Sequence, residues 1–348
     1  MSKSRICVFL AVCLMLALAA CGGRQPSAAP APAAERHKVI IDTDMGADDA
    51  AALILAASSD SLEILGVTVL YGNVALEQAA DNALAVLELC GREAPVYIGA
   101  DKPLEKPRPE MIWVHGKDGL GDRDLVHPSG SPETGSAVDF ILDTVRRNPG
   151  EIELVALGPL TNVARAVLQD PEAMRQVKHI WVMGTCGFGA GNASPVAEFN
   201  VYNDAEAYDA VLRAELPMTV IGLDCCLEET RLSQADLDAM AKGNKLGAFM
   251  SKGFTKLNET YVSQGQLLAV PDATAVAALI WPDYVLETRR CYGLTCTGDD
   301  AVYGQVILYR EGTVYEAIPE IGEYNLEVVS QIDGALYKRR FMALMTGK

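Results

Sequence analysis

Short apolar runs rich in β-branched residues alternate with helical patterns through the first part of the chain, and this alternation restricts the fold more than any other feature. Strands are expected at 38–43, 62–70, 152–157, 179–183 and 218–223. Helices are expected between them, at 47–58, 75–89, 136–147, 160–169 and 204–213. Near-continuous apolar strands separated by helices are typical of a mostly parallel sheet that helices cover on both faces. We therefore expect an α/β fold whose ligand site lies beyond the carboxyl ends of the strands.

The last third of the chain has a different pattern. Helices are expected at 246–261 and 274–280, strand-like sequence from 285 to 329, and a final helix at 332–345. No second segment rich in Pro, Gly or Ser separates this part from the first one. Residues 37–348 are therefore expected to form a single domain.

Residues 1–20 have the organisation of a signal peptide, with positive residues before an apolar run that is too short to span a bilayer. The run ends in L-A-A-C at Cys21, which resembles the lipobox of bacterial lipoproteins, where the cysteine becomes the lipidated first residue. Residues 21–36 are rich in Pro and Ala and are expected to form an extended tether. These features predict an extracytoplasmic protein of the cell envelope, anchored to a membrane through Cys21. The alternative is an ordinary secretion signal with a chance cysteine.

The charge of the chain excludes one class of partner. The formal net charge is −17. Binding a nucleic-acid backbone requires clustered Lys and Arg, so no nucleic-acid partner is expected. The same charge argues against a polybasic contribution to membrane binding.

Six cysteines remain after Cys21. They are Cys90, Cys186, Cys225, Cys226, Cys291 and Cys296. No Cys or His spacing among them indicates zinc. Disulfides are permitted outside the cytoplasm, although a domain of this length does not need them. Cys291 and Cys296 are the favoured pair because they flank an expected strand turn.

An acidic cluster follows the first expected strand. Asp42 and Asp44 stand two residues apart at the strand end and so point to the same face. Asp48 and Asp49 open the following helix, where the helix dipole favours negative charge. Four carboxylates in eight residues repel one another, and a bound cation removes that repulsion. Oxygen ligands without His or Cys favour a hard ion, Ca²⁺ or Mg²⁺.

Three alternative structures share parts of this acidic pattern. An EF-hand loop is excluded, because the glycine is fifth instead of sixth and the twelfth residue is Leu53. Helix capping explains Asp48 or Asp49 singly but not the whole cluster. A phosphatase of the haloacid dehalogenase type stays open as a minor alternative, because it also begins with D-x-D after a strand.

From Asp42 to Leu53 the chain reads D-T-D-M-G-A-D-D-A-A-A-L, which resembles the signature D-x-D-P-G-x-D-D-A-x-A-L of the inosine-uridine preferring nucleoside hydrolase family. Met45 stands where the family has proline. Further blocks follow in order: V-L-Y-G-N ending at Asn73, V-H-G-K-D-G-L-G containing His115, L-G-P-L-T-N from Leu157, V-M-G-T from Val182, G-N-A-S-P-V-A-E-F-N from Gly191, and P-D-A-T-A-V-A-A-L from Pro271. The resemblance implies a Rossmann-like α/β fold, tightly bound Ca²⁺, and cleavage of ribonucleosides to ribose and free base.

Carried over position by position, the resemblance implies a role for each site residue. The expected Ca²⁺ ligands are Asp44, Asp49, the main-chain carbonyl of Leu157, and Asp272. Asp44 is also the expected catalytic base, which takes a proton from the attacking water. The expected substrate-binding residues are Asp48, Asn73, His115, Glu198 and Asn200, with Asn192 on the 5′-hydroxyl. Asp42 is left with a supporting role behind the metal.

The leaving base is where the chain departs from the family. The best-known members have a histidine just before the last aspartate, whereas this chain has Pro271. Stacking on Trp113 or Tyr261 is one substitute, and His115 is either a catalytic or a structural histidine. The adjacent Cys225 and Cys226 are expected either to line the pocket or to pack in the core.

Two functions are compatible with these residues. The first is a hydrolase at the cell envelope that salvages extracellular nucleosides. The second is a lipoprotein that binds nucleoside or ribose and has weak or no turnover, which the missing histidine and Met45 motivate. Because family members are often dimers or tetramers, a homodimer or homotetramer is compatible with either function.

Overall fold

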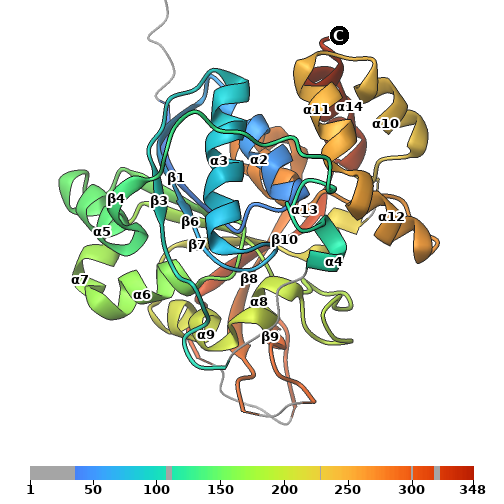
Figure 1. Ribbon diagram of the computed structural model, residues 1–348. Helices are drawn as coiled ribbons and strands as arrows, with labels where there is room; N and C mark the ends of the chain where they lie inside the picture. Colours follow the sequence, from blue (N-terminus) through green and yellow to red (C-terminus); the bar gives the residue numbers. More distant parts are fainter. Residues whose placement is uncertain (1–35, 107–111, 228, 299–300, 317–321) are drawn as a thin grey trace, which may run out of the picture. The chain divides into compact units, whose positions relative to one another are not determined.

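A ten-stranded mixed sheet forms the centre of the fold (Figure 1). The computed structural model describes residues 36–106, 112–227, 229–298, 301–316 and 322–348. Across the sheet, the strand order is β4-β3-β2-β1-β5-β6-β7-β10-β8-β9. The strands are β1 His37–Thr43, β2 Leu62–Val69, β3 Val96–Ile98, β4 Glu133–Ser136, β5 Ile152–Ala156, β6 His179–Met183, β7 Met218–Ile221, β8 Val285–Thr295, β9 Val306–Arg310 and β10 Leu326–Ile332.

Helices lie on both faces of this sheet (Figure 1). In chain order they are α2 Ala47–Ala57, α3 Leu76–Cys90, α4 Ile112–His115, α5 Ala137–Arg147, α6 Thr161–Gln169, α7 Pro171–Met174, α8 Phe199–Asn203, α9 Ala205–Arg213, α10 Gln234–Ala241, α11 Lys245–Gly253, α12 Thr255–Ser263, α13 Pro271–Ile280 and α14 Gly334–Thr346. Two 3₁₀ turns, η1 Leu223–Leu227 and η2 Pro282–Tyr284, complete them. One hydrophobic core contains residues of α2, α3, α13 and α14, and a second contains residues of α5, α6 and α9.

The centre of the sheet is parallel and buried. β1 pairs in parallel with β2 on one side and with β5 on the other. Its apolar residues Val39, Ile40 and Ile41 are fully buried, as expected for a strand covered on both faces. Because the parallel strands β1, β2, β5, β6 and β7 end at one edge, the loops that follow them meet there. The expected fold class, a mostly parallel α/β sheet flanked by helices, is confirmed.

The last strands make the sheet mixed. β10 runs parallel to β7 but antiparallel to β8, and β8 is antiparallel to β9. The expected Cys291–Cys296 disulfide is wrong, because the two cysteines are not joined in a disulfide. Cys291 lies within β8 and Cys296 directly follows it, so no turn separates them. Five residues of extended chain span roughly 16 Å, whereas disulfide-bonded Cα atoms lie within about 7 Å.

Some expected elements differ from the observed ones. The helix expected at 246–261 is two helices, α11 and α12, which meet at the fully buried Phe254. Leu246, Met250, Phe254 and Leu257 continue a helical spacing across that junction, so the pattern carries no sign of the break. Six further strands and α-helices, β3, β4, α4, α7, α8 and α10, were not expected.

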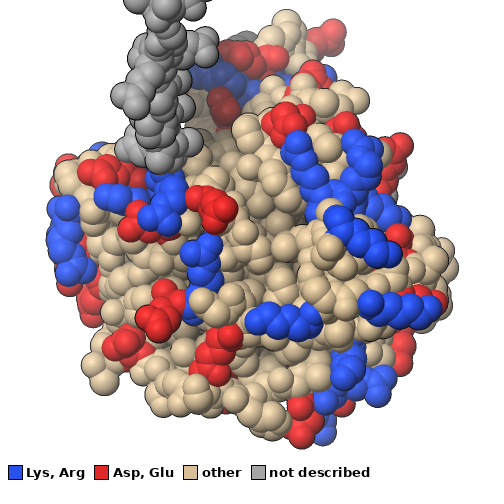
Figure 2. Space-filling model, turned by 90° about the horizontal axis from the view of Figure 1, so that it is seen from above, with Lys and Arg blue, Asp and Glu red and all other residues tan. Residues whose placement is uncertain are grey.

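Basic and acidic side chains are intermixed on the face shown in Figure 2. Ion pairs among the described residues include Lys38 with Glu151 at 2.6 Å and Arg340 with Asp283 at 2.7 Å. Exposed pairs of this kind contribute little to stability. Although the net charge of the chain is negative, this face therefore carries charges of both signs.

The predicted signal peptide at 1–20, Cys21 and the predicted tether up to residue 35 lie outside the described residues. Among the residues that the structure describes, no helix combines the length and the apolar character needed to cross a membrane.

Candidate functional site

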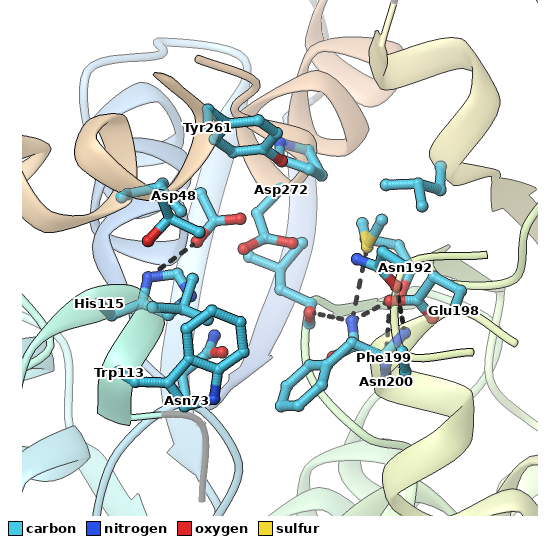
Figure 3. A pocket seen from close by; sticks show the side chains of 18 of the residues that line it. Asp48, Asn73, Trp113, His115, Asn192, Glu198, Phe199, Asn200, Tyr261 and Asp272 are labelled. Atoms are coloured by element: carbon cyan, nitrogen blue, oxygen red, sulfur yellow. Dashed lines mark hydrogen bonds and ion pairs between the residues drawn. The ribbon is translucent and has the colours of Figure 1, made fainter. Parts of the chain in front are cut away.

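A pocket opens at the edge where the parallel strands end (Figure 3). Its walls come from the segments after β2, β5 and β6, from the 3₁₀ turn η1 after β7, and from the helices α2, α4, α8, α12 and α13. Seven of the residues that the sequence singled out line it by their side chains: Asp48, Asn73, His115, Asn192, Glu198, Asn200 and Asp272. Leu157 lines it as well. Segments far apart in sequence therefore form one site, as expected for a parallel sheet.

Three carboxylates gather where α2 and α13 meet. Asp48 and Asp49 lie in the first turn of α2, and Asp272 lies in the first turn of α13. One oxygen from each lies within 4.8 Å of the others. Pro271 begins α13, a position that suits proline because its fixed φ is helical and its missing N–H has no partner to lose. The two helix N-termini thus aim these carboxylates at one point.

Asp44 lies outside this group of three, but it shares a hydrogen-bond donor, Asn73, with Asp49 of the group. Its carboxylate accepts hydrogen bonds from the backbone N–H of Asn73 at 2.8 Å and from the Asn73 amide at 3.1 Å. The same amide donates to Asp49 at 3.0 Å. Asp49 also accepts from the Thr43 hydroxyl at 2.5 Å and from the backbone N–H of Gly46 at 2.8 Å. Asn73 therefore joins the predicted catalytic base to a predicted metal ligand.

The electrostatics of these groups favour a bound cation. Burial, followed by the neighbouring carboxylates, raises the pKa of Asp44 and of Asp272 well above the ordinary value. Burial also raises the pKa of Asp48 and of Asp49 to about 6. Within the described residues, Asp48 Oδ1 is buried and has no hydrogen-bond partner. The donors are all oxygens, so the residues fit a hard divalent ion such as Ca²⁺.

The opposite wall is built around α8. Glu198 caps this helix and accepts hydrogen bonds from the backbone N–H groups of Asn200 at 2.9 Å and Val201 at 3.2 Å. Burial raises the pKa of Glu198 to about 7. The Asn200 amide donates to the carbonyl of Leu157 at 2.7 Å and to that of Met183 at 3.1 Å. The predicted carbonyl ligand is thereby fixed in place, with a second lone pair left on its oxygen.

Asn192 lies at the outer part of this wall. Its side-chain oxygen accepts a hydrogen bond from the backbone N–H of Phe199 at 2.9 Å, and the residue is exposed. The bond ties the loop before α8 to the start of that helix, and both residues line the pocket.

His115 lies at the end of α4, close to the first turn of α2. Its Nδ1 accepts a hydrogen bond from the backbone N–H of Ala47 at 3.1 Å, and Asp48 Oδ1 is 3.7 Å from the same nitrogen. Burial lowers the pKa of His115 to about 4. A nitrogen that accepts from an amide carries no proton, so His115 is neutral and Nε2 bears the hydrogen.

Aromatic and polar side chains form the outer end of the pocket. Trp113 of α4 is 62% exposed, and Tyr261 faces the pocket from α12 (Figure 3). Three more lining residues, Leu257, Thr260 and Gln264, belong to or directly follow α12 and were not predicted. Together with Tyr261 they are spaced three or four residues apart, which places them on one helix face. This spacing is the one feature of the sequence that could have indicated a helix face lining the pocket.

Other residues near the site have structural roles. Asp42 is buried behind the pocket, where one oxygen accepts hydrogen bonds from Thr68 at 2.5 Å and Asn162 at 2.8 Å. Cys225 and Cys226 are buried and do not line the pocket, so they pack in the core.

Met45 shows how the chain departs from the D-x-D-P-G pattern. Its φ is +46°, in the left-handed region, and its backbone N–H donates to the Thr43 hydroxyl at 3.2 Å. Its carbonyl accepts from the Asn82 amide at 3.0 Å. Proline can adopt neither this φ nor this donor role. The turn between Asp44 and Gly46 is therefore built differently from one that contains proline.

Comparisons with known proteins agree with this geometry. The profile of the inosine-uridine preferring nucleoside hydrolase family matches residues 39–339. Uridine nucleosidase 1 of Arabidopsis thaliana is 40% identical over 215 residues, which are 61% of this chain and 63% of that protein. The chain thus spans slightly less than two thirds of that relative.

Two further relatives are matched over more of their length. The pyrimidine-specific ribonucleoside hydrolase RihB of Escherichia coli is 32% identical over 288 residues, covering 78% of this chain and 90% of that one. The solved structure of a purine-preferring ribonucleoside hydrolase from Gardnerella vaginalis has a TM-score of 0.80 at 28% identity, covering 89% of this chain and 98% of the other.

Proposed function

The chain belongs to the inosine-uridine preferring nucleoside hydrolase family, and from this premise we propose that it hydrolyses the N-glycosidic bond of ribonucleosides, with Ca²⁺, to ribose and free base. The observation that carries this proposal is the group of buried carboxylates from two helix N-termini at the pocket wall, with the hydrogen-bonding side chains of Asn73, Glu198 and Asn200 around it. A sugar diol and a hard cation both require such oxygen-rich surroundings.

In this proposal Asp49, Asp272, Asp44 and the Leu157 carbonyl hold the cation. A Ca²⁺ ion bound there would neutralise these carboxylates and would make the attacking water more acidic. Asp44, held by two hydrogen bonds from Asn73, accepts the proton of the attacking water.

The remaining polar groups act on the sugar. Asp48, Asn73, Glu198 and Asn200 hold the ribose hydroxyls, and Asn192 binds the 5′-hydroxyl. Asp48 Oδ1 has no hydrogen-bond partner within the described protein, so a ribose hydroxyl supplies the missing hydrogen bond. The reaction passes through an oxocarbenium-like state, which the nearby carboxylates stabilise.

The leaving base meets the outer end of the pocket. Pro271 carries no proton to give, so neutral donors take the place of a histidine there. Two such donors line the pocket, the Tyr261 hydroxyl and the protonated Nε2 of His115. Stacking on Trp113 holds the base while the bond breaks.

We propose that the protein works at the cell envelope, lipid-anchored through Cys21, where it salvages nucleosides. Mass spectrometry of the mature protein tests this part independently. A diacylglycerol-modified Cys21 as the first residue supports it, and an unmodified N-terminus contradicts it.

The central experiment is product analysis with inosine, adenosine, uridine and cytidine, with Ca²⁺ and with a chelator. Release of free base and ribose that stops on chelation and returns with Ca²⁺ is the expected result. Calorimetric binding of nucleoside without any product would instead identify a binding lipoprotein. Activity that persists unchanged in chelator would contradict the role of the cation.

A further inference from the structure

A turn in the connection between β8 and β9 packs against the helix that carries Glu198 and Asn200. This turn, residues 302–305, is called the buttress turn below. Hydrogen bonds close it: Gly304 N–H donates to Cys296 O at 2.8 Å, Cys296 N–H to Gln305 O at 2.8 Å, and Gln305 N–H to Val302 O at 2.9 Å. In Figure 1 the ribbon of β8 lies beside α9. The buttress turn is therefore a stiff element placed behind one wall of the pocket.

Tyr303 makes the polar contacts of the buttress turn. It is 1% exposed, and its hydroxyl accepts a hydrogen bond from the backbone N–H of Ala205 at 3.3 Å while donating to the Glu206 carboxylate. Its ring meets that of Tyr202 edge to face, with centroids 5.7 Å apart. Lys106 lies over the same ring at 4.3 Å and reaches Glu206 at 3.3 Å. Tyr303 thus fixes the junction between α8 and α9.

Gly304 makes the closest contact. Its φ is +78°, and a Cβ added there would lie 3.0 Å from the Cα of Tyr202 and 3.1 Å from the Cβ of Ala197. Ala197 immediately precedes Glu198, and Tyr202 follows Asn200 by two residues. The buttress turn therefore lies close to both ends of the segment 197–202. Two residues inside this segment, Glu198 and Asn200, line the pocket.

The helix α8 needs such support. It has only five residues, far fewer than an isolated helix requires to be stable in water. Its position is set by what packs around it, which on the pocket side is the Asn200 amide bonded to Leu157 and Met183. On the other side it is the buttress turn. Displacing reacting groups by about 1 Å can reduce a rate roughly a hundredfold.

We propose that Tyr303 and Gly304 are positioning residues, which act through the segment 197–205 to hold Glu198 and Asn200 against the ribose hydroxyls. The inference rests on the proposed function, because it assigns the buttress turn a part in that same site. It also explains why a surface connection contains a fully buried tyrosine beside a left-handed glycine.

A matched pair of glycines separates this role from general stability. Gly304→Ala adds a methyl group to a left-handed residue that touches α8. Gly312→Ala adds the same methyl group at nearly the same φ, +74°, where no atom lies within 4 Å. Both variants carry similar backbone strain, and only the first disturbs the segment at 197–202. Steady-state kinetics with uridine, 2′-deoxyuridine and 3′-deoxyuridine measure the difference.

Gly304→Ala is expected to lower kcat/KM for uridine about tenfold and to reduce the preference for uridine over a deoxy analogue. Because the analogue lacks a hydroxyl that the displaced groups would bind, its kcat/KM falls less than that of uridine. Gly312→Ala is expected to leave both values within about twofold of the parent. Equal losses on all three substrates, the same loss in Gly312→Ala, or no loss in Gly304→Ala would each overturn the proposal.

A second variant covers the case in which Gly304→Ala does not fold. Tyr303→Phe removes only the hydroxyl and its bonds to Ala205 and Glu206, and it is expected to lower the uridine preference two- to fivefold. Equal changes on uridine and its deoxy analogues would count against the inference. If the parent protein turns over none of inosine, adenosine, uridine and cytidine, the proposed hydrolysis fails first. Calorimetry with ribose and 2-deoxyribose then tests the same variants, with the same selective loss expected.

Discussion

The two ends of the pocket are built in different ways. At the end proposed to hold the sugar, Asn73 lines the pocket and donates hydrogen bonds to Asp44 and Asp49, which are buried and do not line it themselves. At the base end, Trp113 is 62% exposed and stands on a helix of four residues, while Gln264 is exposed at the end of α12. The sugar end is therefore fixed by the core, whereas the base end depends on surface helices.

The largest effect is expected from Asp44→Ala at the sugar end. The change removes the predicted catalytic base and one predicted cation ligand, so kcat with Ca²⁺ should fall at least about a thousandfold. Base release from uridine and inosine measures it. Asp81→Ala, at an exposed position of α3, is the control and should keep full activity. If the variant kept activity within about tenfold of the parent, Asp44 would not be the catalytic base of the proposed hydrolysis.

A smaller effect concerns Glu198 and pH. Burial raises its pKa from 4.5 to about 7, so folding favours the protonated form. The stability gained is complete below about pH 4.5 and is lost as the pH rises through about 7. Between these pH values, the metal-free parent should lose up to about 3 kcal/mol more unfolding free energy than Glu198→Gln. Urea denaturation in chelator measures this, and parallel pH profiles for the two proteins would refute the burial of an ionisable group at this wall.

The smallest effect is expected from Trp113→Ala at the base end. Losing an aromatic surface for the base costs roughly 1–3 kcal/mol of binding, so KM should rise about tenfold while kcat changes far less than in Asp44→Ala. Kinetics with uridine and inosine measure both constants. Val262→Ala changes an equally exposed residue of α12 that does not line the pocket, and it should be neutral. A fall in kcat with no change in KM would place Trp113 in the chemistry instead.

The same division explains how far the sequence could be interpreted. The strands β1, β2, β5, β6 and β7 are mostly apolar and are followed by short motifs, so both the strands and several of the residues that line the pocket were predictable. In contrast, β4 has the sequence E-T-G-S and is largely exposed, so it offers no apolar pattern. The wall of α12 was missed because its helix spacing resembles that of a core helix.

Two further features depend on contacts that no local pattern records. The junction of α11 and α12 at Phe254 interrupts a continuous helical spacing. The buttress turn contacts α8 from about a hundred residues later in the chain, and nothing in its own sequence indicates that contact. The roles of the individual site residues stay predictions until the variants are measured.

The burial of α2 links the pocket to the folding of the whole domain. Ten of its eleven residues are buried, and Asp48 and Asp49 stand in its first turn. A cation held there stabilises the helix that runs through the larger core, so its binding free energy adds to global stability and not to a loop alone. Amide hydrogen exchange in α2, which proceeds through large-scale opening, then reports whether the site is filled. The exchange rate of the amides in this core helix therefore measures how fully the cation site is occupied.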